Sequence, residues 1–139
     1  MAAQQLLQDV LEAALYASDI DAAEAFYGEI LGLEKISRLD GRHVFFRCGQ
    51  TIVLIFNATE TEKPTHSDTM PVPSHGARGR GHLCFTVHGD DLDAVAKRLA
   101  DNKVEIEADF CWPNGARSIY FRDPSGNSLE CAESKLWNL

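Results

Sequence analysis

The chain repeats one order of expected secondary structure about 70 residues apart. In residues 21–31 apolar side chains have the spacing of a single helix face, starting at Ala23, and residues 92–101 repeat that spacing from Leu92, 69 residues later. Each expected helix follows a segment in which apolar side chains alternate with others, at residues 11–18 and 82–88. The sequence therefore predicts a duplicated strand–helix unit, which limits the folds that the chain can adopt.

Three further strands are expected after each helix. Asp40-Gly41 and Asn114-Gly115 are hairpin turn signals between these segments. The expected strands are residues 33–39, 43–47 and 51–57 in the first unit and 104–112, 116–122 and 128–132 in the second. The sequence therefore predicts an α+β fold of two βαβββ modules. Each is a half-barrel that does not close alone, so the two should share one cup-shaped cleft.

The predicted organisation is a single domain over residues 1–139, with module one at 10–57 and module two at 82–133. The segment between them, 58–81, has three prolines, three glycines and no periodicity. A run of that length without regular structure is expected to be a linker or a lid.

Two helix starts are suggested by acidic residues. Asp21 followed by Glu24 has the spacing of a capping box for the first helix. Asp90 or Asp91 can cap the second helix.

Composition excludes several classes of protein. With 13 basic and 21 acidic residues the net charge is −8, which argues against nucleic-acid binding. The longest strictly apolar run, Ile52–Phe56, is too short to cross a membrane. No basic leader precedes an apolar stretch, so we expect a cytoplasmic protein in which the four cysteines are reduced, small core residues.

Three strands each carry one potential metal ligand on the face opposite the expected helix contacts. These residues are Glu12, His82 and Glu130. Taken singly, each is more often solvated or satisfied by a neighbour than bound to a metal. Their shared facing at repeat-related positions predicts a divalent-cation site with positions left open for substrate.

Three segments resemble the vicinal oxygen chelate superfamily, which includes glyoxalases, bleomycin-resistance proteins and extradiol dioxygenases. Ser18-Asp19-Ile20-Asp21 with Phe26-Tyr27 is similar to the opening of its first module. Residues 81–87 (GHLCFTV) resemble the start of its second module, and residues 121–130 (FRDPSGNSLE) resemble its closing strand pair. The resemblance implies paired βαβββ modules around a metal site, and commonly a homodimer.

Carried over by position, the metal ligands would be Glu12, His82 and Glu130. The resemblance also suggests that Glu130 or Glu12 acts as a catalytic base. Glyoxalase-like members use a fourth ligand, and its expected position is Val53, which cannot coordinate. Two carboxylates and one imidazole suit one divalent ion, Mn²⁺, Ni²⁺, Co²⁺, Mg²⁺, Fe²⁺ or Zn²⁺.

The resemblance leaves several functions open. We favour a metal-dependent, glyoxalase-like lyase or isomerase acting on a small oxygenated substrate through a stabilised enolate or alkoxide. A thiol transferase and an extradiol dioxygenase are alternatives within the same superfamily, although one histidine disfavours oxygen chemistry. A metal-free dimer that sequesters a ligand, as bleomycin-resistance proteins do, is the alternative outside catalysis.

Four further residues are weaker candidates for substrate binding. Arg78 and Arg80 lie in a glycine-rich stretch just before His82 and could bind a carboxylate or phosphate. Arg117 follows the Asn114-Gly115 turn. Trp112 could form an aromatic wall of the cleft with Phe110 and Tyr120, and core or dimer packing would explain these rings equally well.

Overall fold

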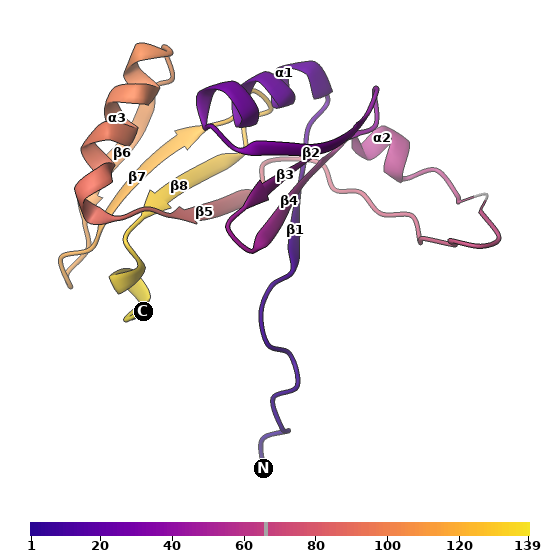
Figure 1. The fold of residues 1–139 in the computed structure, drawn as a ribbon, viewed down its shortest axis with the longest axis horizontal. Coiled ribbons are helices and arrows are strands. Elements are labelled where there is room, and N and C mark those ends of the chain that lie inside the picture. Colours follow the sequence, from indigo (N-terminus) through magenta and orange to yellow (C-terminus); the bar gives the residue numbers. More distant parts are fainter. Residues whose placement is uncertain (66) are drawn as a thin grey trace.

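The computed structural model describes residues 1–65 and 67–139, and two four-stranded sheets dominate it (Figure 1). Their strand orders are β1-β4-β3-β2 and β5-β8-β7-β6, so the second sheet repeats the first. In both sheets the outer strand β1 or β5 runs parallel to its neighbour, and the other pairs are antiparallel. The strands are β1 Glu12–Tyr16, β2 Glu34–Leu39, β3 His43–Cys48, β4 Thr51–Phe56, β5 His82–Thr86, β6 Ile106–Cys111, β7 Arg117–Arg122 and β8 Ser128–Ala132.

The two main helices, α1 and α3, lie along one side of the two sheets (Figure 1). The first helix has two parts, α1 (Ile20–Glu24) and the π-helical turn η1 (Ala25–Ile30), and the main helix of the second unit is α3 (Leu92–Asp101). The short helices are α2 Ala58–Thr61, η2 Gly89–Asp91 and η3 Ser134–Trp137. The predicted period therefore matches both main helices, whereas α2 falls in the segment that was expected to lack regular structure.

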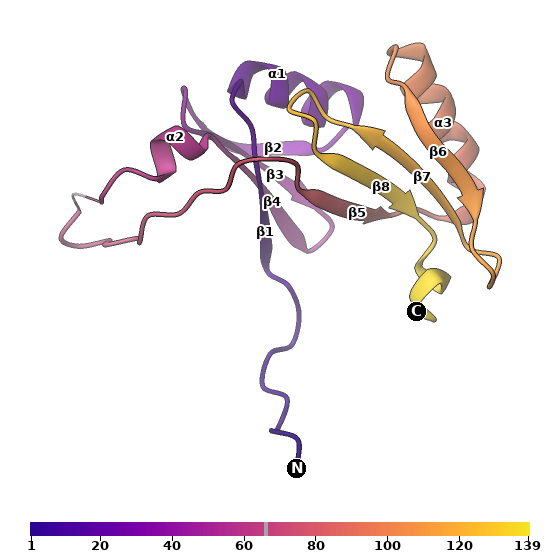
Figure 2. The same ribbon diagram turned by 180° about the vertical axis from the view of Figure 1, so that it is seen from behind.

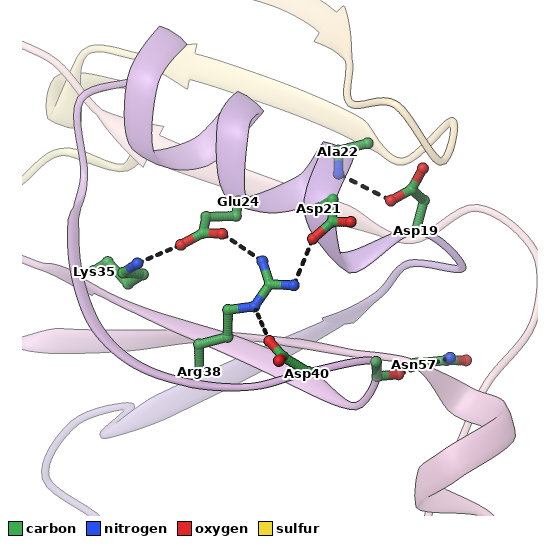
Figure 3. A network of polar contacts seen from close by, with 9 residues as sticks. Asp19, Asp21, Ala22, Glu24, Lys35, Arg38, Asp40 and Asn57 are labelled. Carbon is green, nitrogen blue, oxygen red and sulfur yellow. Dashed lines mark hydrogen bonds and ion pairs between the residues drawn. The ribbon is translucent and has the colours of Figure 1, made fainter.

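The predicted capping box at the first helix is wrong. Asp19 is the N-cap, and its side chain accepts a hydrogen bond of 3.0 Å from the backbone nitrogen of Ala22 (Figure 3). Asp21 and Glu24 instead pair with the guanidinium of Arg38 on β2. Asp91 precedes α3 but makes no side-chain capping bond. Acidic residues next to a helix start thus serve either the backbone or a neighbouring strand, and the spacing alone does not distinguish the two.

One hydrophobic core spans both units. The helix-facing residues of the first sheet, such as Leu15, Phe46 and Ile55, belong to the same cluster as Phe121 and Leu129 of the second sheet. Burial of these side chains against the shared helices is the main driving force for joining the two units.

A buried polar turn fastens the two units together. Asp123 accepts a hydrogen bond of 2.6 Å from the hydroxyl of Tyr27, which is fully buried in the first helix. Asn127 donates to Asp123 and to the backbone carbonyl of Tyr16, and accepts from the backbone nitrogen of Gly81. Since these groups come from both units and from the segment between them, the turn sets how the units meet.

The segment before β1 departs from the body of the molecule. Residues 1–11, called here the N-terminal arm, project away from both sheets in two opposite views (Figures 1 and 2). Leu11, the first residue of the expected strand segment over residues 11–18, belongs to this arm and is 75% exposed. It lies beyond the end of the strand, so it has no helix to pack against.

The cysteines differ from the expectation that all four are core residues. All are free, and only Cys131 is buried; Cys48 is half-buried, and Cys84 and Cys111 are exposed. Across the described residues no helix is both long and apolar enough to cross a bilayer.

Candidate functional site

The second sheet presents a polar face on the side opposite its core, here called the cleft face. Glu130 of β8 lies between Cys84 of β5 and Tyr120 of β7 in the strand register. His82 and Ser118 are each two residues from those neighbours, so strand alternation places them on the same face. Leu129 and Cys131 point to the opposite, core side.

His82 and Glu130 lie close enough to act on one ligand. The Nε2 atom of His82 is 3.4 Å from Oε1 of Glu130. Nδ1 of His82 lies 2.8 Å from the backbone carbonyl of Ser128, which can only accept, so Nδ1 carries the proton in that bond. In the neutral ring Nε2 then has a lone pair facing a carboxylate oxygen. This arrangement calls for a proton or a metal ion between the two atoms, and it is the imidazole tautomer that a metal requires.

Ser118 orients the carboxylate of Glu130. Its hydroxyl donates to Oε2 of Glu130 at 2.6 Å and accepts from the indole nitrogen of Trp112 at 2.8 Å. Glu130 is only 4% exposed, so this chain holds a buried carboxylate with one oxygen occupied and the other directed toward His82. Sequence reasoning missed Ser118. The signal for it was its place on the same alternating face as Tyr120.

Two protonated groups border Glu130. Cys84 is exposed as a residue, but the partial burial of its thiol, together with the negative charge of Glu130, raises the pKa of that thiol to about 12. The same two causes, in the same order, raise the pKa of the Tyr120 hydroxyl to about 12. Both groups therefore remain protonated near neutral pH and can donate hydrogen bonds to the carboxylate or to a bound ligand.

The charge of Glu130 should control the reactivity of Cys84. At pH 8 a thiol with a pKa near 12 is about 10⁻⁴ ionised, so we expect slow alkylation by iodoacetamide. Glu130→Gln removes a charge that raises this pKa, and we expect alkylation of Cys84 to speed up roughly three- to tenfold. Peptide mass spectrometry on chelator-treated protein would follow Cys84, with Cys111 as the internal reference. Glu29→Gln, on the exposed side of η1, is the control, and an unchanged Cys84 rate in Glu130→Gln would contradict the assignment.

The fold of a single chain does not bring Glu12 close to His82 and Glu130. Over residues 1–65 and 67–139 no three His, Cys, Asp or Glu side chains lie close enough together to hold a metal ion. Tyr16, the last residue of β1, lines the same pocket as His82. Glu12 is the first residue of β1, about 13 Å from Tyr16 along the strand. Two of the three predicted ligands therefore meet in one chain, and the third does not.

The strand registers also move the expected fourth ligand position by one residue. Val53 is 2% exposed and packs in the core, so it does not face the same side as Glu12. In the second sheet Glu130 pairs with the residue two positions after His82; in the first sheet Leu54 pairs with the residue two positions after Glu12. Leu54 therefore occupies the position equivalent to Glu130. It cannot coordinate a metal either.

A pocket of about 240 Å³ adjoins His82. Its lining includes Arg78, Arg80 and Tyr16, so it lies where β1 meets the start of β5. The guanidinium of Arg78 donates to Glu62 at 2.7 Å, which places one arginine in an ion pair at the rim. The pocket therefore brings two arginine side chains next to His82.

The remaining two candidates lie at different places. Arg117 binds both oxygens of Asp109 at 2.8 Å and also pairs with Asp93 of α3, so it ties a strand to a helix. Trp112 contacts Phe110, with ring centroids 4.9 Å apart, and Phe110 stacks on Tyr120 at 5.9 Å. The three rings therefore form a cluster next to Glu130, and Trp112 is linked to that carboxylate through Ser118.

The duplicated sheets and the His82–Glu130 pair define a class of protein. A family model described as the Glyoxalase/Bleomycin resistance protein/Dioxygenase superfamily matches residues 9–131, and the chain belongs to this superfamily. Among solved structures, a lactoylglutathione lyase from Agrobacterium tumefaciens is 41% identical, with a TM-score of 0.92; the match covers 97% of this chain and all of that one.

Two curated relatives match most of the chain at lower identity. Glutathione transferase FosA of Serratia marcescens is 28% identical over 90% of this chain and 80% of its own length. The uncharacterised protein YaeR of Escherichia coli is 29% identical over 91% of this chain and 97% of its own length.

Proposed function

We propose that this protein is a cytosolic, metal-dependent enzyme with glyoxalase-like lyase or isomerase activity on a small oxygenated substrate. The observation that carries the proposal is the pairing of Nε2 of His82 with the buried carboxylate of Glu130 at 3.4 Å. Neither atom has a proton to donate when the ring is neutral, so a cation bound between them relieves their repulsion.

We propose that the third ligand is Glu12 of a second copy of the chain in a homodimer. Glu12 is exposed and stands apart from His82 and Glu130 of its own chain. Two carboxylates and one imidazole match the preferences of a divalent ion of intermediate hardness. Such an ion, when bound, polarises adjacent substrate oxygens and stabilises an enolate or alkoxide.

The chain's own residues would carry the proton transfers and the binding. Glu130 is the candidate base, because Ser118 holds one of its oxygens and the other faces the cleft. Tyr120 and Cys84 keep their protons near neutral pH and can donate to a developing oxyanion. Arg78 and Arg80 line the adjoining pocket and suit a substrate with a carboxylate group.

The comparisons favour lyase chemistry among the alternatives. The 41%-identical structure is named a lactoylglutathione lyase, so the first substrate to assay is the hemithioacetal of a 2-oxoaldehyde and glutathione. The more distant relative FosA is named a glutathione transferase, which keeps thiol transfer as the second candidate reaction. Both names contain glutathione, whose carboxylate groups suit the arginines of the pocket.

Metal content is the direct test. Untagged protein purified without chelator should hold about one divalent ion per chain, measured by elemental mass spectrometry. We expect His82→Ala and Glu12→Ala to lose this ion and any hemithioacetal turnover. His88→Ala and Glu29→Ala replace exposed residues of the same types elsewhere, and they should retain both.

A metal-free binding dimer is the second candidate function. The observation that favours it is that a single chain, over its described residues, assembles no complete metal-ligand set. An empty wild-type protein that also fails to load Mn²⁺, Ni²⁺ or Zn²⁺ would contradict the enzyme proposal and support ligand sequestration.

A further inference from the structure

We propose that the N-terminal arm is a clasp that packs on the C-terminal turn η3 of a second copy of this chain. The proposal rests on the proposed function in one respect, because both require a second copy near Glu12. It goes further by naming the two surfaces that hold the copies together.

The arm carries apolar side chains that nothing in its own chain covers. Leu6, Leu7, Val10 and Leu11 are 75%, 84%, 64% and 75% exposed. The only charged side chain in residues 1–11 is that of Asp9. A run of exposed apolar residues this dense is unusual on a soluble surface and marks an interaction site.

The arm's attachment points its apolar residues away from their own core. The carbonyls of Val10 and Leu11 accept hydrogen bonds from the Thr51 hydroxyl and the Ile52 backbone nitrogen. The arm is therefore attached to the sheet at its last two residues, next to the start of β1. Residues 1–9 then continue away from the body in both views (Figures 1 and 2). An extended segment gains burial for these side chains only by lying on another molecule.

The position of Glu12 favours a second copy of this chain as the molecule that covers the arm. It follows Leu11 without a break, so a surface that receives the arm also receives Glu12 nearby. His82 and Glu130 lack a third ligand in their own chain. Clasping by the arm would therefore position Glu12 at the cleft face of the other copy.

The receiving surface is the exposed C-terminal turn. Trp137 and Leu139 are 76% and 87% exposed at the end of η3. The turn and the arm project to the same side of the molecule, away from the helices α1 and α3 (Figures 1 and 2). A two-fold axis on that side lets each copy offer its arm to the other's turn, which is the self-complementary arrangement of a closed dimer.

Substitutions in the arm test the clasp. Residues 1–12 are exposed in their own chain, so Leu6→Ser, Leu7→Ser and Val10→Ser together should leave the protomer folded. We expect the triple variant to weaken dimerisation at least about tenfold in sedimentation velocity over a concentration series. Trp137→Ser, on the receiving side, should weaken it in the same direction. Met70→Ser with Val72→Ser changes exposed apolar residues of the 58–81 segment and is the matched control, expected to leave dimerisation unchanged.

The outcomes separate this inference from the proposed function. A wild-type monomer, or a dimer unaffected by the arm variant, would overturn the clasp even if the protein binds its metal. An effect of the arm variant without one of Trp137→Ser would overturn the assigned receiving surface. If the arm variant dissociates a wild-type dimer that never binds Mn²⁺, Ni²⁺ or Zn²⁺, the clasp stands and the metal site does not.

Discussion

Co-expression of Glu12→Ala and His82→Ala chains should restore metal binding that neither variant has alone. If Glu12 and His82 meet across two copies, a mixed dimer places both substitutions in one site and leaves the other site intact. Random pairing of equal amounts makes about half of the dimers mixed, so about a quarter of all sites should be intact. Elemental mass spectrometry of the co-purified protein should therefore show roughly a quarter of the wild-type content of divalent ion.

The control for this experiment is a pair of substitutions from one side of the site. Chains carrying His82→Ala and Glu130→Ala should not complement each other, because both residues come from the same chain. Recovery in that pair, or none in the first pair despite verified mixed dimers, would contradict a shared site. The result bears directly on the chemistry, since it identifies which chain supplies each ligand.

Asp123→Ala should destabilise the protein more than any surface substitution. Asp123 is 5% exposed and accepts hydrogen bonds from Tyr27, from both nitrogens of Asn127 and from the backbone of Ser125. Its removal leaves the buried Tyr27 hydroxyl and the backbone nitrogen of Asn127 without an acceptor. We expect a loss of about 3 kcal/mol in the free energy of unfolding, or roughly 10 °C in the melting temperature.

Urea unfolding followed by circular dichroism would measure this loss. Asp101→Ala is the matched control, because Asp101 is an exposed carboxylate that pairs with Lys97 on the same helix. It should leave the urea midpoint unchanged within error. A small effect of Asp123→Ala would mean that water takes over the hydrogen bonds and that the turn does not join the two units energetically.

The pattern of single residues determined much of the fold. The helix over 92–101 and the strand over 128–132 match the structure at both ends because their spacing reports burial directly: apolar side chains recur wherever one side of an element meets the core. The duplicated strand order follows for the same reason, since both units bury the same faces. Alternation also placed His82 and Glu130 on one face, and they are 3.4 Å apart.

Features that depend on pairing between distant segments did not follow from the pattern. The expected fourth ligand position was Val53, whereas the register between β1 and β4 gives this position to Leu54, one residue later. A shift of one residue moves a side chain to the other face of a strand. Asp19 rather than Asp21 caps the first helix because the helix begins at Ile20, and Asp21 pairs with Arg38 of β2.

The composition of the chain and the periodicity of its side chains determined by themselves that the protein has two βαβββ units and a pair of ligand-type residues on one face. The contact between Ser118 and Glu130, and the separation of Glu12 from Glu130, became visible in the folded chain. Both depend on residues that are far apart in the sequence. Periodicity records which side of an element is buried, whereas the meeting of three side chains depends on how two separate sheets pack and on which ends of their strands approach each other.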